Sequence, residues 1–125
     1  MNPTPNPLLF VVDDEPLLIE LATALLEPAG YTVETFLDPE TALEAFVASD
    51  PRPAVVITDY SMHRMTGIDL MRECRQVNPG QKVILVSGTV DDTICQNSRV
   101  KPDRFLAKPY QSRQLIAAVQ SLLAV

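Results

Sequence analysis

Four short apolar runs dominate the pattern of this chain, and each of them ends at a reactive polar residue. Leu8 to Val12 is followed by Asp13 and Asp14, Ala54 to Thr58 by Asp59, Lys82 to Val86 by Ser87, and Phe105 to Ala107 by Lys108. Such runs, separated by helical patterns, are typical of buried strands in a parallel sheet. Parallel strands bring their carboxyl ends to one edge, where ligands bind. We therefore expect three carboxylates, a hydroxyl and an ammonium to meet there.

The segments between these runs predict helices and one further strand. Tyr31 to Phe36 alternates in polarity like a strand, and Asp38 is expected to cap the helix that follows it. Thr66 and Asp69 resemble a capping box, whereas 91–98 gives only a weak helical signal. Five strands alternating with five helices predict an α/β, doubly wound fold with helices on both faces of a parallel sheet. The residues expected to form the buried stripe of the first helix are Leu18, Leu21, Ala22 and Leu25.

Length, charge and cysteine content exclude several classes of protein. A chain of 125 residues suits one domain, and a net charge of -6 without a basic cluster argues against direct nucleic-acid binding or a membrane surface. The longest apolar stretch is far shorter than the roughly 18 residues of a membrane span. Cys74 and Cys95 lack the spacing of a disulfide framework or zinc site, which favours reduced thiols in the cytoplasm. We expect a disordered tip over 1–7, which lacks the charge pattern of a secretory signal, and one domain over 8–125.

The crowded carboxylates predict a metal ion. At separations of about 4 to 6 Å, each pair of Asp13, Asp14 and Asp59 would repel by on the order of 1 kcal/mol in water, and by more when buried. Lys108 alone cannot neutralise three carboxylates, whereas an all-oxygen site suits Mg²⁺. Asp59 could then attack phosphorus and form an acyl phosphate, while Ser87 and Lys108 bind the transferred oxygens. No glycine-rich loop follows the first run, so the chain lacks the P-loop and the dinucleotide fingerprint.

Four motifs resemble those of the receiver domains of two-component response regulators. They are the acidic pair Asp13-Asp14, the loop from Asp59 to Gly67, the pair Ser87-Gly88 and the pair Lys108-Pro109. The resemblance covers the chain from Leu8 to about Leu123. It implies a flavodoxin-like (βα)5 three-layer sandwich with a five-stranded parallel sheet in the order 2-1-3-4-5.

The same resemblance implies a function in a phosphorelay. Asp59 would accept a phosphoryl group from the phosphohistidine of a sensor histidine kinase or of a histidine phosphotransfer protein. The groups implied as Mg²⁺ ligands are Asp13, Asp14, Asp59 and the backbone carbonyl of Ser61. The domain would not be an enzyme beyond its own phosphotransfer and autodephosphorylation. It would signal to an unidentified downstream protein. Whether phosphorylation also produces a homodimer is left open by the resemblance.

The resemblance also implies a switch. Ser87 and Lys108 would sense the phosphoryl group, and Phe105 would turn inward as the aromatic switch residue. A cis peptide is expected before Pro109. His63 stands where the family commonly has proline, and we expect it to be an exposed loop residue.

Two other functions remain open from the sequence. A phosphatase of the haloacid dehalogenase type also uses a strand-end aspartate, a hydroxyl and a lysine. That family carries an Asp-x-Asp pattern on its first strand, and this chain lacks it. The second alternative is an interaction module that keeps the fold but is never phosphorylated. The intact acidic pair, acceptor and lysine argue against it.

Overall fold

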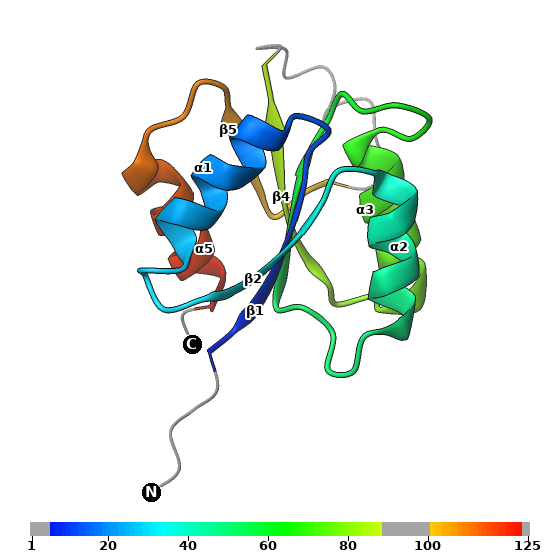
Figure 1. Ribbon diagram of the computed structural model, residues 1–125. Coiled ribbons are helices and arrows are strands. Elements are labelled where there is room, and N and C mark those ends of the chain that lie inside the picture. Colours follow the sequence, from blue (N-terminus) through cyan, green and yellow to red (C-terminus); the bar gives the residue numbers. More distant parts are fainter. Residues whose placement is uncertain (1–5, 89–100, 124–125) are drawn as a thin grey trace, which may run out of the picture.

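The protein folds around a five-stranded parallel sheet, shown in Figure 1 as a computed structural model that describes residues 6–88 and 101–123. The strands are β1 (Leu8–Val12), β2 (Thr32–Phe36), β3 (Val55–Asp59), β4 (Lys82–Ser87) and β5 (Arg104–Ala107). Every neighbouring pair is parallel, and the order across the sheet is β2-β1-β3-β4-β5. The predicted fold class and strand order are confirmed.

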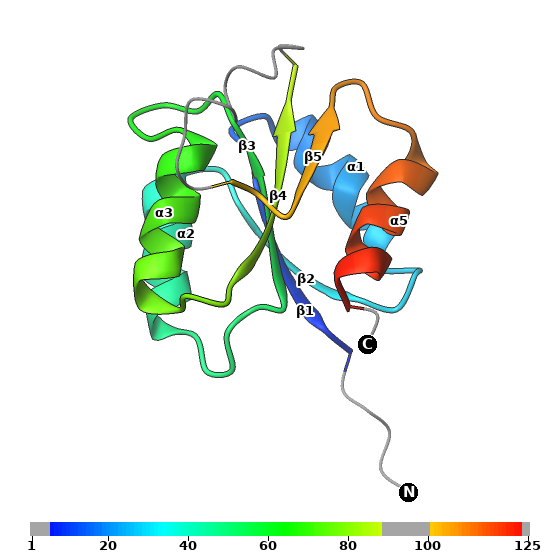
Figure 2. The ribbon, with the colours of Figure 1, turned by 180° about the vertical axis from the view of Figure 1, so that it is seen from behind.

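Helices cover both faces of the sheet, which gives three layers. The described helices are α1 (Pro16–Leu26), α2 (Pro39–Ala48), α3 (Gly67–Val77) and α5 (Ser112–Leu123). Figures 1 and 2 show α1 and α5 on one face and α2 and α3 on the other. The helix expected over 91–98 lies outside the described residues. Of the helices in the described part of the chain, none is long and apolar enough to cross a bilayer.

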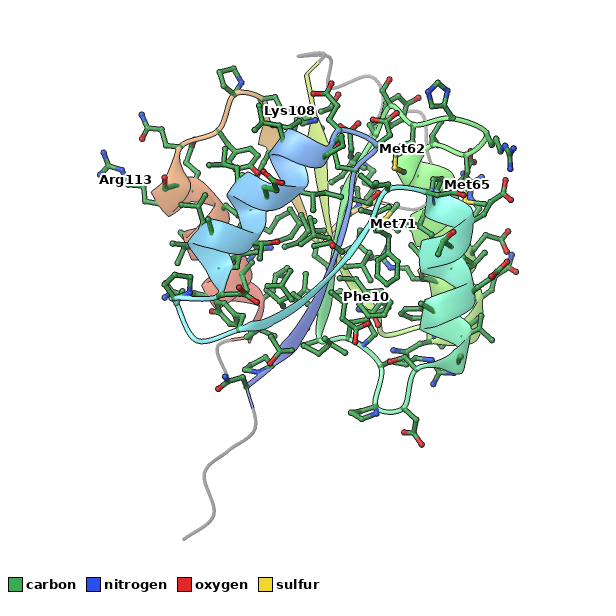
Figure 3. All side chains as sticks on the ribbon, in the orientation of Figure 1. Phe10, Met62, Met65, Met71, Lys108 and Arg113 are labelled. Carbon is green, nitrogen blue, oxygen red and sulfur yellow. The ribbon has the colours of Figure 1, made fainter. Side chains whose placement is uncertain are left out.

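The core consists of two apolar clusters, one on each face of the sheet. Strands β1, β3 and β4 alternate between them, so that Phe10 and Val12 pack toward α2 and α3 while Leu9 and Val11 pack toward α1 and α5. Figure 3 shows Phe10 in the layer between the sheet and α2. Burial on both faces explains why these strands are almost continuously apolar, as expected for the centre of a parallel sheet.

Side-chain caps fix the starts of two helices on the α2–α3 face. The Asp38 carboxylate accepts a hydrogen bond of 3.1 Å from the backbone N–H of Glu40. Thr66 and Asp69 form the predicted capping box, with both reciprocal bonds at 3.1 Å. These caps confirm the sequence prediction, and the second of them anchors the far end of the loop that leaves β3.

The buried face of α1 agrees with the predicted one only in part, since Ala22 is buried and Leu25 packs against the core as predicted. Its buried residues are Ile19, Ala22 and Leu26, whereas Leu21 is 50% exposed. The helix carries apolar residues around most of its circumference, so more than one stripe satisfies helical spacing. Packing against the sheet decides which of these stripes is buried. The helical spacing of apolar residues alone does not decide it.

Burial of Cys74 in α3 predicts a loss of stability in alkali. Burial, helped by the nearby Glu73 carboxylate, raises the pKa of the thiol from an ordinary 9.0 to about 12. Between these values the unfolded chain loses the proton and the folded chain keeps it, so the free energy of unfolding falls as pH rises. We expect the parent to lose about 1 kcal/mol more than Cys74→Ala between pH 8 and pH 10.

Urea melts of both proteins at the two pH values test this expectation. Each protein is compared with its own value at pH 8, because the alanine variant also carries a cavity. Lysine and tyrosine titration is common to both proteins and cancels. Equal losses in the two proteins would show that the thiol does not titrate in this way.

Candidate functional site

Three carboxylates meet at the carboxyl edge of the sheet. Asp13 and Asp14 follow β1, and Asp59 is the last residue of β3. Because β1 pairs with β3 in the register Val12 to Thr58, Asp13 and Asp59 leave neighbouring strands at the same level. One carboxylate oxygen from each of the three residues lies within 4.8 Å of the others. Asp13 and Asp59 are buried, and Asp14 is partly exposed. The structure thus brings together the acidic cluster that the sequence predicts.

Lys108 reaches this cluster from the end of β5. Its Nζ lies 3.0 Å from Asp59 Oδ1 and 3.1 Å from Asp13 Oδ2. The Lys108 backbone N–H donates to the Ser87 carbonyl at 2.8 Å, which fixes the lysine at the end of the neighbouring strand. The Lys108–Pro109 peptide is cis, as the resemblance implies. Figure 3 shows Lys108 at the edge of the sheet where the strands end.

The electrostatics of the site show a shortage of positive charge. Burial raises the pKa of Asp59, and the hydrogen bond from Lys108 only partly opposes it, while Asp13 and Asp14 raise it further. Burial alone would lower the pKa of Lys108, but its bonds to Asp59 and Asp13 outweigh burial and raise it. The lysine is therefore firmly charged, yet one ammonium does not compensate three carboxylates.

The donor set fits Mg²⁺. Three carboxylates against one ammonium leave an excess of two negative charges, which is the charge of one divalent cation. All of the grouped donors are oxygens, the ligands that Mg²⁺ takes in proteins, and Mg²⁺ usually keeps several waters as well. The partial exposure of Asp14 leaves one side of the cluster accessible to such waters.

The remaining predicted site residues come from β4, from β5 and from the loop after β3. Ser87 is buried at the end of β4, opposite Ala107 of β5. Ser61 is exposed in the loop after β3, two residues beyond Asp59. Phe105 is half-buried and packs against the apolar core cluster on the α2–α3 face of the sheet. The roles of these three residues stay predictions.

A pocket adjoins the acidic cluster on the side of Asp14. Its volume is about 530 Å³, and its other lining residues are Leu37, Asp38, Pro39, His63 and Arg64. His63 is almost fully exposed, as predicted, with Nε2 3.9 Å from Asp14 Oδ2. The site is therefore open to a ligand that approaches from the loops after β2 and β3.

Sequence reasoning did not foresee the contacts that two residues, Gly67 and Thr58, make with the backbone of Asp59. A Cβ at Gly67 would lie 2.4 Å from the Asp59 carbonyl oxygen, so the first residue of α3 has room for hydrogen only. The Thr58 hydroxyl donates to the same carbonyl at 3.0 Å. The signal available for Thr58 was a single polar residue within an apolar run, and for Gly67 a glycine at a helix start.

The fold and the site together define a class of protein: a doubly wound α/β domain with an acidic cluster and a lysine at the carboxyl edge of its sheet. The chain belongs to the response regulator receiver domain family, which it matches over residues 9–120. This is the family of two-component signalling whose motifs the sequence resembles.

Individual relatives agree with this assignment. The chain is 32% identical to the probable transcriptional regulatory protein TcrX of Mycobacterium tuberculosis, over 92% of this chain and 49% of TcrX. It therefore spans about half the length of that relative. A receiver domain structure from Clostridium thermocellum has 27% identity and a TM-score of 0.87, covering 94% of both chains. Response regulator TrrA of Thermotoga maritima, solved in complex with Mg²⁺-BeF, has 28% identity and a TM-score of 0.84, covering 94% of this chain and 99% of TrrA.

Proposed function

We propose that this domain is the phosphoacceptor of a two-component phosphorelay and is phosphorylated on Asp59 in a Mg²⁺-dependent reaction. The observation that carries the proposal is the contact of Lys108 with Asp59 inside a cluster of three carboxylates. In the reaction an Asp59 carboxylate oxygen attacks phosphorus and the P–N bond of the donor phosphohistidine breaks. The imidazole nitrogen leaves with the electron pair. A bound Mg²⁺, held by Asp13, Asp14, Asp59 and the Ser61 carbonyl, would neutralise the incoming phosphoryl oxygens.

The other residues of the site act on the phosphoryl group once it is transferred. The Lys108 ammonium, already 3.0 Å from Asp59, pairs with a phosphoryl oxygen, and the Ser87 hydroxyl donates to another. The added dianion shifts the population toward a state in which Ser87 and Phe105 have moved inward. The output of the domain is a changed protein-interaction surface. The domain does not turn over a separate substrate in this proposal.

Residues 8–125 form one receiver domain in this proposal. Its phosphodonor is a sensor histidine kinase or a histidine phosphotransfer protein in the cytoplasm. TcrX is described as a transcriptional regulatory protein, but only about half of it aligns with this chain. The expectation that this domain does not itself contact nucleic acid rests on its negative charge.

Incubation with acetyl phosphate and Mg²⁺, followed by intact mass measurement, tests the proposal. We expect the parent to gain one phosphoryl group and Asp59→Asn to gain none, because the amide is not a nucleophile. Asp50→Asn, the same change at an exposed position, is the control and should gain the group normally. EDTA should abolish the gain in the parent. A gain by Asp59→Asn would place the acceptor elsewhere.

The two alternatives predict different results when intact mass measurement is combined with an assay of phosphate release from a small phosphate ester. A phosphatase of the haloacid dehalogenase type would release phosphate from a small phosphate ester over many turnovers. An unphosphorylated interaction module would show neither turnover nor a gain of mass. Each alternative is therefore distinguished from a phosphoacceptor by one measurement on the parent protein.

A further inference from the structure

We propose that the buried hydroxyl of Thr58 positions the loop that carries the metal-binding oxygens and so sets the Mg²⁺ affinity of the domain. The inference rests on the proposed function, because it takes Asp59 and the Ser61 carbonyl as ligands. Thr58 comes directly before Asp59 in β3 and is 0% exposed. Side chains alternate along a strand, so Thr58 faces α2 and α3 while Asp59 faces the other way.

The Thr58 hydroxyl touches both ends of the short segment that contains Ser61. Oγ1 donates to the Asp59 carbonyl oxygen at 3.0 Å and lies 3.9 Å from Met62 Sδ. Asp59 begins this segment, and Met62 follows Ser61 directly. One buried hydroxyl therefore bonds the residue that begins the turn carrying the Ser61 carbonyl and contacts the residue that ends it.

The rest of the loop is held by different contacts. The Gly67 N–H donates to the Tyr60 carbonyl at 2.9 Å, and the capping box at Thr66 fixes the start of α3. Met65 N–H donates to the His63 carbonyl at 2.8 Å. Of these contacts in the described part of the loop, that of the Thr58 hydroxyl is the one that reaches Met62, beside the expected carbonyl ligand.

The strand itself does not need a hydroxyl at this position. Valine has nearly the same shape and an equal or better preference for strands, and the neighbouring buried positions of β3 are Val55, Val56 and Ile57. Among the buried residues of the described strands, the polar ones are Thr58, Asp59 and Ser87. Asp59 and Ser87 belong to the site already described. A buried hydroxyl at Thr58 is thus explained by what it bonds and not by strand formation.

Mg²⁺ titration of Thr58→Val and Thr58→Ser by calorimetry tests this inference. We expect Thr58→Val to weaken Mg²⁺ binding about fivefold, the effect of one lost hydrogen bond. Thr58→Ser keeps the hydroxyl and should bind within about twofold of the parent. Thr23→Val is the matched control, because the Thr23 hydroxyl also donates to a backbone carbonyl, that of Ile19 in α1, at 2.9 Å. It should leave Mg²⁺ affinity unchanged.

The readouts separate this inference from a structural role and from the proposed function. Thermal melts without metal report stability, so a Thr58→Val that melts lower but binds Mg²⁺ like the parent overturns the inference. Failure of the parent to bind Mg²⁺ or to gain a phosphoryl group overturns the proposed function instead. If Thr58→Val does not fold, the pair Thr58→Ala and Thr58→Ser decides, because the two variants differ only in the hydroxyl: Thr58→Ala should bind Mg²⁺ about fivefold more weakly than Thr58→Ser, and equal binding by the two refutes the inference.

Discussion

Lys108→Gln is expected to slow the phosphorylation of Asp59 by acetyl phosphate about 10²- to 10³-fold and at the same time to tighten Mg²⁺ binding. The rate falls because the Lys108 ammonium, 3.0 Å from Asp59 Oδ1, is preorganised where negative charge accumulates on the transferred group. Mg²⁺ binding tightens because the ammonium competes with the cation for Asp13 and Asp59. Removing one positive charge so close to two of the expected ligands should strengthen Mg²⁺ binding by on the order of 1 kcal/mol, which is about fivefold in affinity.

The opposite signs of the two effects make the prediction specific. Single-turnover phosphorylation gives the rate at saturating Mg²⁺, and calorimetry gives the affinity for the ion. Lys101→Gln, the same change at an exposed lysine, should alter neither quantity. If Lys108→Gln lost rate and Mg²⁺ affinity together, the lysine would be organising the carboxylates and not competing with the metal ion.

The site was predictable because parallel topology converts sequence position into spatial position. Asp13, Asp59, Ser87 and Lys108 each follow an apolar run, and a parallel sheet brings the ends of its strands to one edge. No contact between side chains had to be known in advance. The strand order came from the resemblance, and the structure confirms it.

Features set by packing were less accessible from the sequence. The first helix has several apolar stripes, and only contact with the sheet selects Ile19 over Leu21. The contacts that support Asp59 are made to its backbone: a hydrogen bond from the Thr58 hydroxyl and the close approach of Gly67 to the Asp59 carbonyl. Such contacts leave little trace in residue type, because threonine and glycine occur for many other reasons. They nevertheless lie directly against the Asp59 backbone.

The second large effect is expected for Gly67→Ala, which should destabilise the fold by about 2 kcal/mol and lower the melting temperature by roughly 5–10 °C. The added Cβ would lie 2.4 Å from the Asp59 carbonyl oxygen and 2.7 Å from Leu85 Cδ1. Neither neighbour retreats freely, because one is backbone and the other is fully buried. Relief then requires α3 and β3 to separate, and alanine's better helix propensity returns at most about 1 kcal/mol.

The same displacement should reach the chemistry, since the atom that is pushed belongs to Asp59, the proposed phosphoacceptor. A misplacement of about 1 Å at a reacting group can cost about 10²-fold in rate, and for a smaller shift we expect about a tenfold slower gain of the phosphoryl group by the folded variant. Gly80→Ala is the matched control, because a Cβ there meets nothing within 4 Å. Thermal melts and phosphorylation kinetics on both variants decide the matter. Equal behaviour of the two would mean that the contact between α3 and the Asp59 carbonyl relaxes without cost, and that the acceptor's position does not depend on it.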